Sequence, residues 1–275
     1  MKLAGHTMGT PEMTVPEAAA LFASLGMEGI EIVCLEGYKS GIDVATDAKA
    51  REALRSACAA RRLEVICLTP YFQEFNSPDA TVRGEHLDGL KQSIVLAKDL
   101  GAGMIRVLAG KEVPPEERSR ALPLLVEALR EAADFAGGHG VRLAIENHRG
   151  TMAITARQTM EVIDAIGRPN VGVLYDQANL TQWRGEDYQE ALELQWDCLF
   201  HVHLKDIAIT DTQRRAKLLG EGMIPCAEIV RALRDRGYDG YICFEYERRS
   251  RPDELPEPRT GFAACMKFVA AALRG

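Results

Sequence analysis

The chain has 275 residues, of which 47% are hydrophobic and 27% are charged, and its formal net charge is −7. This composition excludes a disordered chain and is sufficient for a large buried core. The acidic balance and the lack of a long basic block argue against nucleic-acid binding. No apolar run approaches the roughly 18–20 residues of a membrane-spanning helix. We expect a globular protein that binds neither nucleic acid nor membranes.

The cysteines predict the cellular compartment. There are seven of them, at positions 34, 58, 67, 198, 226, 243 and 265, and no pair has the Cys-x-x-Cys spacing. An odd number of cysteines, several of them inside apolar runs, indicates buried free thiols in a reducing environment. The N-terminal residues read as a strand and lack the profile of a signal peptide. We therefore expect a cytoplasmic protein.

Short apolar runs alternate along the chain with longer segments of helical periodicity. The runs are Lys2–His6, Gly29–Leu35, Leu63–Pro70, Met104–Ala109, Val141–Asn147, Val171–Asp176, Cys198–Lys205 and Tyr241–Glu245. Most are continuously apolar, as expected for parallel strands that are covered on both faces. The eight runs therefore predict eight parallel strands.

Helices are predicted in every interval between these strands and after the last one. They run from Thr14 to Gly26, around 50–57, from Ser77 to Gly101, from Pro114 to Gly137, from Thr155 to Gly167, from about Gly185 to Trp196, from Pro225 to Gly237, and from Thr260 onward. Two of them begin with a capping box, formed by Thr14 with Glu17 and by Thr155 with Gln158. Strict βα alternation, with one unit in about 34 residues, favours a single (β/α)8 TIM barrel domain over residues 1–275.

Polar side chains occur at the carboxyl ends of the last four predicted strands, where barrel enzymes place their chemistry. These ends carry Glu146, Asp176, a histidine and Glu245. Three carboxylates gathered at one rim repel one another unless a cation offsets the charge. This donor set suits Mn²⁺, Mg²⁺, Co²⁺ or, at lower coordination number, Zn²⁺. The alternative is that each group forms its own rim salt bridge, but four on consecutive strands favour a metal site.

Two histidines compete for the position on the seventh strand. His201 and His203 are two residues apart and therefore point to the same face. His203 lies nearer the rim, next to Lys205 and Asp206, and is the predicted ligand. For His201 we expect a buried, hydrogen-bonded core position outside the ligand set.

Several motifs together resemble the sugar phosphate isomerase/epimerase family of xylose isomerase-like TIM barrels, over nearly the whole chain. They are Glu146-Asn147-His148, Tyr175-Asp176-x-x-Asn179, His201-x-His203-x-Lys205-Asp206, Gly220-Glu221-Gly222 and the terminal Glu245. The resemblance implies that Glu146, Asp176, His203 and Glu245 hold one divalent ion, for which we expect Mn²⁺. It also implies that Glu146 and Glu245 are the catalytic acid/base pair and act through an enediolate intermediate.

One branch of the superfamily is excluded. Endonuclease IV members hold three zinc ions and need further histidines on the third and fourth strands and after Asp176. Here the third strand ends at Thr69-Pro70-Tyr71, the fourth carries Arg106, and position 179 is Asn179. A site for three zinc ions cannot be assembled from these residues.

Five residues near the rim are candidates for substrate binding, and each has a structural alternative. They are Arg106, His148, Asn179, Lys205 and His6. Arg106 could instead only neutralise Glu146, His148 and Asn179 could form loop hydrogen bonds or orient ligands, and Lys205 could form a structural pair with Asp206.

Further from the rim, Trp183 with Arg184 could cover the mouth of the barrel, and Glu221 could reach the substrate or lie in a solvated turn. Arg248, Arg249 and Arg251 could bind a carboxylate or phosphate, or form a solvated run balanced by Asp253, Glu254 and Glu257.

The leading functional prediction is a metal-dependent isomerase or epimerase that acts on a small keto sugar or related polyol. A dehydratase of the inosose or dehydroshikimate type would share every ligand and is the first alternative. A non-catalytic sugar-binding barrel is the second, although such a protein would be expected to lose a ligand. A homo-oligomer is possible, because the helices are rich in Ala, Leu and Met.

Overall fold

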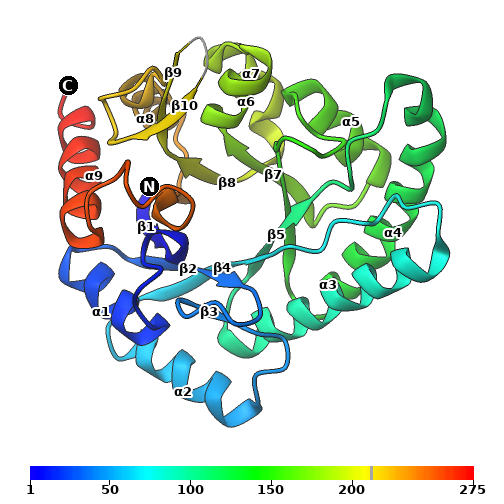
Figure 1. Ribbon diagram of the computed structural model, residues 1–275, viewed down its shortest axis with the longest axis horizontal. Coiled ribbons are helices and arrows are strands. Elements are labelled where there is room, and N and C mark those ends of the chain that lie inside the picture. The colour runs from blue at the N-terminus through cyan, green and yellow to red at the C-terminus, as the bar shows by residue number, and fades with distance from the viewer. Residues whose placement is uncertain (211–212) are drawn as a thin grey trace.

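The computed structural model describes residues 1–210 and 213–275, and within these ranges eight parallel strands close into a barrel (Figure 1). The barrel strands are β1 (Lys2–His6), β2 (Gly29–Cys34), β4 (Glu64–Pro70), β5 (Met104–Leu108), β6 (Arg142–Glu146), β7 (Val171–Asp176), β8 (Leu199–Leu204) and β11 (Tyr241–Phe244). Each strand pairs with the next barrel strand along the chain, and β11 pairs with β1, so the barrel has no free edge. The (β/α)8 prediction is confirmed.

The helices form a ring outside the strands (Figure 1). They are α1 (Val15–Ser24), α2 (Ala48–Ala59), α3 (Ala80–Leu100), α4 (Arg118–Gly138), α5 (Ala156–Ile166), α6 (Gln177–Arg184), α7 (Tyr188–Gln195), α8 (Cys226–Asp235) and α9 (Pro258–Ala272), with short 3-10 turns η1 (Thr7–Gly9), η2 (Pro115–Glu117), η3 (Trp196–Cys198) and η4 (Glu247–Arg249). Both predicted capping boxes, at Thr14 and at Thr155, are present.

Helix α6 differs from the prediction, which began the helix after β7 only at Gly185. The side chain of Asp176 accepts a hydrogen bond from the backbone N–H of Asn179 at 3.0 Å and starts a helix immediately at the strand end. Gly185, with a φ of 65°, ends α6 in the left-handed conformation, and α7 follows. The predicted helix therefore corresponds to α7, and α6 is an additional helix that begins at the rim of the barrel.

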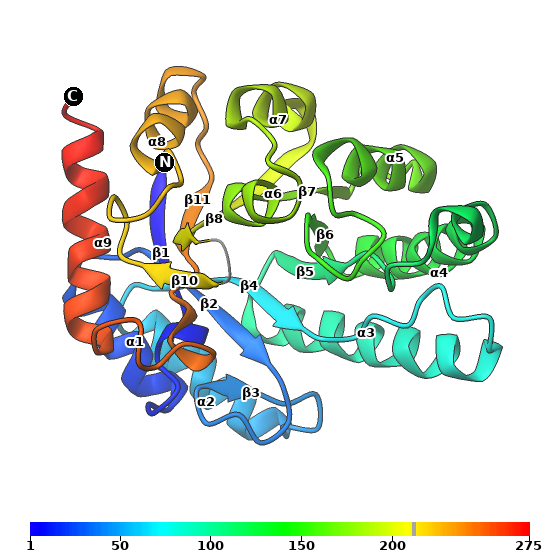
Figure 2. The same cartoon turned by 45° about the horizontal axis from the view of Figure 1, so that its top comes forward.

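A small antiparallel ribbon was also not predicted. It is formed by β9 (Asp206–Ile209) and β10 (Arg214–Lys217) and lies beyond the carboxyl end of β8 (Figure 2). The two-residue strand β3 (Gly41–Ile42) pairs with the end of β2. Both additions extend the carboxyl-terminal side of the barrel, where the polar residues collect.

The barrel interior contains a small apolar cluster made only of strand residues. Its buried members are Ala4, Ile66, Cys67, Met104, Ala144, Leu174 and Cys243. Three of them, Ala144, Leu174 and Cys243, lie two residues before Glu146, Asp176 and Glu245, and so point to the same face one step deeper. This cluster forms an apolar floor beneath the polar rim.

All seven cysteines are free thiols, and six of them are buried, leaving only Cys198 partly accessible. Within residues 1–210 and 213–275, no helix is both long and apolar enough to cross a bilayer.

Candidate metal centre and the cavity above it

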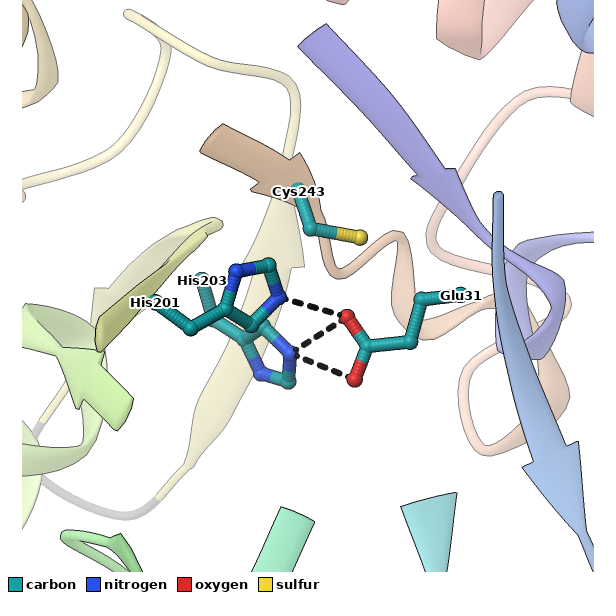
Figure 3. A group of neighbouring side chains, drawn as sticks. All are labelled: Glu31, His201, His203 and Cys243. Atoms are coloured by element: carbon teal, nitrogen blue, oxygen red, sulfur yellow. Dashed lines mark hydrogen bonds and ion pairs between the residues drawn. The ribbon is translucent and has the colours of Figure 1, made fainter. Parts of the chain in front are cut away.

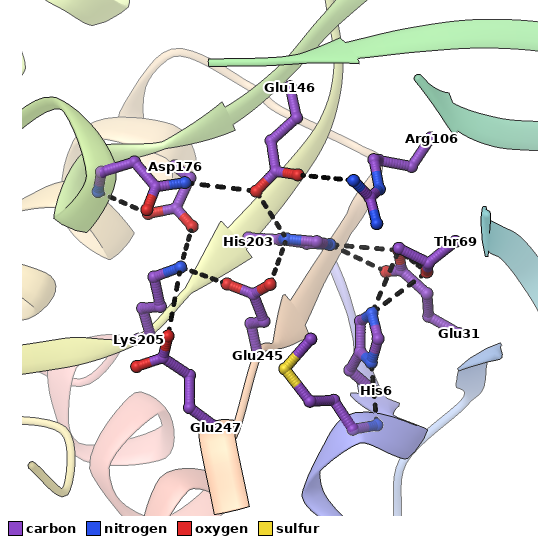
Figure 4. A network of polar contacts seen from close by, with 12 residues as sticks. His6, Glu31, Thr69, Arg106, Glu146, Asp176, His203, Lys205, Glu245 and Glu247 are labelled. Atoms are coloured by element: carbon purple, nitrogen blue, oxygen red, sulfur yellow. Dashed lines mark hydrogen bonds and ion pairs between the residues drawn. The ribbon is translucent and has the colours of Figure 1, made fainter. Parts of the chain in front are cut away.

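Four side chains converge at the carboxyl ends of four consecutive barrel strands (Figure 4). Glu146 ends β6, Asp176 ends β7, His203 lies on β8 and Glu245 directly follows β11. Each offers one donor atom within 4.8 Å of the others, and all four are buried. The structure thus brings together the whole set that was predicted as metal ligands.

The orientation of His203 is fixed from behind by Glu31 of β2. His203 Nε2 donates to Glu31 Oε2 at 3.0 Å. The other ring nitrogen, Nδ1, then faces Glu146 Oε1 at 3.9 Å and Glu245 Oε1 at 3.7 Å. Nδ1 is buried and has no hydrogen-bond partner among the described residues. A buried ring nitrogen without a hydrogen-bond partner, placed between two carboxylates, is the arrangement expected of a metal-ligating histidine.

Glu31 is a site residue that the sequence prediction missed. It is fully buried and also accepts hydrogen bonds from His201 Nε2, at 2.8 Å (Figure 3), and from Thr69 Oγ1, at 3.1 Å (Figure 4). Burial opposes ionisation of Glu31, but the imidazoles of His203, His201 and His6 outweigh it and hold its pKa well below the usual range. The available signal was a lone glutamate inside an apolar strand, which must have buried partners.

His201 is fully buried and bonded to Glu31, in the core position expected of it. Together with Glu31, His203 and Cys243 it forms a second group that could hold a metal (Figure 3). In this group the Glu31 carboxylate already accepts from both imidazoles. The arrangement is therefore a hydrogen-bonded support for His203.

The carboxylates of the four-residue group differ in their protonation behaviour. Burial raises the pKa of Asp176 to about 6, despite its ion pair with Lys205. Burial also raises the pKa of Glu146, an effect that Arg106 offsets only in part. For Glu245 burial acts in the same direction, but Lys205 and His203 outweigh it and hold the pKa well below its usual range.

Two cations neutralise part of this charge. Burial disfavours the charged form of His203, but Glu31, Glu245 and Glu146 raise its pKa to about 9. Lys205 Nζ lies 2.8 Å from Asp176 Oδ2, contacts Glu245 Oε2, and has a pKa raised well above its usual value, since these carboxylates outweigh burial. Lys205 is therefore an ion-pair partner of two of the four predicted ligands.

Arg106 and Asn179 both contact Glu146. Arg106, on β5, is 2% exposed, and its Nη1 lies 3.6 Å from Glu146 Oε2. Its buried Nε has no hydrogen-bond partner among the described residues. Asn179 Nδ2 donates to Glu146 Oε1 at 3.2 Å and to the Asn147 carbonyl at 3.1 Å. Both side chains thus lie at the carboxylate, and Arg106 retains an unused donor.

The two other predicted substrate-binding residues occupy different environments. His6 is fully buried beside Glu31, with Nδ1 accepting from Met8 N at 3.0 Å and Nε2 3.1 Å from Thr69 Oγ1. His148 lies at the mouth, where burial and then the charges of Arg106 and Lys205 lower its pKa to about 4. His148 is therefore neutral at physiological pH.

Asp206 does not pair with Lys205. Its carboxylate accepts from the backbone N–H groups of Gly220 and Gly222, each at 2.9 Å, and of Ile224 at 3.0 Å. A Cβ at Gly222 would come within 2.1 Å of Asp206 Oδ1, which explains the glycine. The Gly220-Glu221-Gly222 motif is therefore a loop wrapped around Asp206, and Glu221 is exposed.

A cavity of about 570 Å³ opens beside the four-residue group, of which Glu245 forms part of the wall. The wall also includes Tyr71, His148, Asn179, Lys205 and Arg249. Arg149 and Trp183 line this cavity and also a neighbouring one of about 490 Å³. Trp183 thus lies at the mouth of the barrel, as its position after the sixth strand suggested. The volume suits a small molecule in contact with Glu245 and with Asn179 and Lys205, which in turn contact Glu146 and Asp176.

The donor set fits a divalent cation. Three carboxylates and one imidazole nitrogen without a partner are gathered in a buried space, and oxygen-rich sites with one nitrogen suit Mn²⁺, Mg²⁺ and Co²⁺. Glu146, Asp176, His203 and Glu245 would hold such an ion, with Glu31 as the outer partner of the histidine.

Known proteins share this fold and sequence pattern. The chain is 25% identical over 257 residues to an inosose dehydratase of Clostridium perfringens, covering 86% of this chain and 84% of the relative. It is 25% identical over 256 residues to a fructoselysine 3-epimerase of Shigella flexneri, covering 89% and 90%. The crystal structure of a D-tagatose 3-epimerase-like protein superposes with a TM-score of 0.81 at 20% identity, over 100% of this chain and 99% of that one. The xylose isomerase-like TIM barrel family matches residues 19–270, and the chain belongs to this family.

Proposed function

We propose that this protein is a divalent-metal-dependent isomerase or epimerase of a small keto sugar or related polyol, acting through an enediolate intermediate. The observation that carries the proposal is the placement of Glu146 and Glu245. They come from strands separated by β7 and β8, yet both lie within 4.0 Å of the same nitrogen of His203. A substrate held at this point would have a carboxylate from each strand beside it.

The surroundings of the two glutamates shift their pKa values in opposite directions, raising that of Glu146 and lowering that of Glu245. Lys205 and His203 keep Glu245 ionised, so its carboxylate is free to accept a proton, and we assign it as the base that acts on the carbon next to the carbonyl. Glu146, whose pKa burial raises, is the group that exchanges a proton with the other side of the substrate. Return of the proton to the opposite face of the same carbon gives an epimer, and return to the neighbouring carbon gives an isomer.

Other residues of the chain hold the substrate and the base. Arg106 donates its unused Nε–H to a substrate oxygen, and His148, neutral and at the mouth, contacts a hydroxyl. Asn179 orients Glu146, and Lys205 keeps Glu245 ionised. A divalent ion, for which we expect Mn²⁺, would supply positive charge next to the oxygens on which negative charge develops.

The test is Glu245→Gln, assayed at saturating Mn²⁺ with a panel of ketoses, inososes, hydroxypyruvate and dehydroshikimate. Transfer of solvent deuterium to carbon, read by mass spectrometry, reports the proton step. We expect this exchange to fall by about 10²–10⁴-fold, because an amide cannot accept the proton. Metal binding should weaken far less, since Glu146, Asp176 and His203 are unchanged. Glu247→Gln removes a carboxylate 3.9 Å from Lys205 but outside the donor set, and should cost much less.

Retention of most turnover by Glu245→Gln would show that Glu245 does not carry the proton. A dehydratase, which shares the first step, would be identified by loss of water from an inosose or dehydroshikimate. Lack of deuterium exchange on the whole panel by the metal-loaded wild type would instead favour a non-catalytic barrel.

A further inference from the structure

The cavity above the four-residue group has an excess of basic side chains. Five of its lining residues are basic and two, Glu245 and Glu247, are acidic. Both acidic side chains already have cationic partners, since Lys205 contacts Glu245 and Arg214 contacts Glu247. Of the remaining arginines, Arg251 lies near Glu254, which leaves Arg149 and Arg249 as the cations of this wall that have no carboxylate within 4.0 Å among the described residues.

Arg249, in η4, differs from the arginines on either side of it. Arg248 lies 3.4 Å from Glu12, and Arg251 lies 3.7 Å from Glu254. In contrast, among residues 1–210 and 213–275 no carboxylate lies within 4.0 Å of the Arg249 guanidinium. Arg249 is thus a half-buried cation on the cavity wall without an anionic partner in the described chain.

Aromatic rings hold Arg249 in place instead. Its guanidinium carbon lies 4.9 Å from the centre of the Tyr38 ring and 5.4 Å from that of Tyr71, and its Nη1 is 3.2 Å from the Tyr71 hydroxyl. Such stacking fixes the plane of the guanidinium and leaves its remaining N–H groups available. A preorganised guanidinium of this kind is suited to two-pronged binding of an oxyanion.

The same tyrosine connects Arg249 to the proposed reaction centre. The guanidinium carbon of Arg106 lies 4.8 Å from the centre of the Tyr71 ring. The guanidinium carbons of Arg106 and Arg249 are therefore no more than about 10 Å apart, given distances of 4.8 and 5.4 Å to one ring centre. Glu245 and Arg249 both line the cavity, so a small sugar held there can contact Glu245 at one end and Arg249 at the other.

A second arginine supports the same conclusion from a different loop. Arg149, three residues after β6, stacks on Trp183 with its guanidinium carbon 5.2 Å from the ring centre and also lines the cavity. It too has no carboxylate within 4.0 Å among the residues that the structure describes. Two arginines held by aromatic rings rather than by acids thus border one cavity.

We propose that the substrate carries an anionic oxygen group, a carboxylate or a phosphate, and that Arg249 binds this group while the keto end lies at Glu146 and Glu245. The inference rests on the proposed function only in taking a sugar-like molecule as the occupant of this cavity. It assigns Arg249 the role of selecting acidic over neutral substrates, with Arg149 as a second contact.

The experiment compares three probes with the same carbon skeleton: D-fructose, D-fructuronate and D-fructose 6-phosphate. Their binding to the Mn²⁺-loaded full chain is measured by calorimetry. We expect at least one acid to bind about tenfold or more tightly than D-fructose, as a charge-assisted hydrogen-bonded pair should provide. The tighter of the two acids distinguishes a carboxylate site from a phosphate site.

Arg249→Gln should abolish this preference while leaving D-fructose binding unchanged, and Arg149→Gln should reduce it. Arg157→Gln is the matched control, because it removes the same charge from an exposed position on α5. The inference is wrong if D-fructose binds as tightly as both acids, if none of the three probes binds, or if Arg249→Gln weakens all three equally.

Failure of the proposed function gives a different result. Binding can be measured without turnover. If the acidic probes bind more tightly than D-fructose in an Arg249-dependent way, but no keto sugar shows deuterium exchange, the isomerase proposal is rejected and the anion site is retained. Exchange with equal preference for neutral and acidic ketoses would reject the anion site alone.

Discussion

Replacement of Glu31 by Gln tests whether the carboxylate behind His203 sets the metal affinity of the site. Glu31 accepts from three donors at 2.8–3.1 Å, namely His201 Nε2, His203 Nε2 and Thr69 Oγ1. A glutamine has nearly the same size, but its amide NH2 is itself a donor. Because His203 Nε2 lies 3.1 Å from Oε1 and 3.0 Å from Oε2 of Glu31, it faces the amide NH2 in either orientation of the glutamine. This contact weakens the hydrogen bond of His203 and favours movement of its proton. If His203 moves its proton to Nδ1, the nitrogen that faces Glu146 and Glu245 can no longer act as a ligand.

The expected loss of metal affinity can be estimated. Removal of the outer partner of a metal-binding histidine costs about 10–100-fold in affinity, or about 1.4–2.8 kcal/mol. At a Mn²⁺ concentration of about 100 times the wild-type Kd, bound metal stabilises the fold by about 2.7 kcal/mol. At the same concentration, the Glu31→Gln protein should gain only about 0.4–1.4 kcal/mol.

The assay is urea unfolding of wild type and variant, each with and without Mn²⁺, together with calorimetric measurement of the Mn²⁺ Kd. For each protein, the increase in the free energy of unfolding on adding Mn²⁺ is taken relative to the same protein without Mn²⁺. The metal-free stability that the variant loses therefore drops out of the comparison. This loss should be several kcal/mol, because Glu31 is a buried charge with several partners. Thr69→Val is the control, because it removes one donor to Glu31 and leaves both imidazole contacts. It should keep the Mn²⁺ Kd within a few-fold of wild type.

An unchanged Mn²⁺ Kd in Glu31→Gln would refute the reasoning, since the hydrogen bond at Nε2 would then not determine which nitrogen of His203 faces the carboxylates. An equal loss in Thr69→Val would show a general loosening of the barrel interior instead.

Two further predictions concern stability and reactivity. Asp206→Asn should lower the free energy of unfolding by about 2–4 kcal/mol, because the carboxylate accepts backbone hydrogen bonds from Gly220, Gly222 and Ile224 that an amide cannot all replace. Urea unfolding measures this loss, and a change below about 0.5 kcal/mol would contradict the prediction. A thiol reagent should titrate all seven cysteines in denaturant but only Cys198 rapidly in the native protein, since burial raises the pKa of Cys34 and Cys58 to about 11 and that of Cys265 to about 12. A rise from pH 7 to pH 9 should not make further thiols react rapidly. Rapid reaction of several thiols at once in the native protein would show that the core opens.

Local sequence signals were sufficient for most of the barrel. The predicted strands Lys2–His6 and Val171–Asp176 coincide with β1 and β7, because continuous apolar runs are what a strand covered on both faces requires. The helix that starts at Thr155 was recognised because its cap is formed by residues three apart in sequence. The rim carboxylates were found for the same reason, since each ends a recognisable strand.

Helix α6 and the β9–β10 ribbon were missed where a side chain changed the local structure through contacts that the pattern did not show. Asp176 had been considered only as a predicted ligand, yet its carboxylate also begins α6. Asp206 organises a loop whose N–H groups lie up to 18 residues further along the chain. The pattern of hydrophobic residues does not predict either of these hydrogen bonds.

The hydrogen bonds that hold His203 from behind could be recognised only in the tertiary structure. Glu31 and His201 are separated by 170 residues in sequence, and β1 and β11 lie between their strands in the barrel order. Only closure of the barrel turns both side chains into the same interior. The sequence by itself determined which residues end the strands, because that depends on local chain properties. The choice of His203 Nδ1 as the nitrogen that faces Glu146 and Glu245, and the stacking of Arg249 on Tyr38 and Tyr71, depend on contacts across the barrel mouth, which exist only once all the strands have come together.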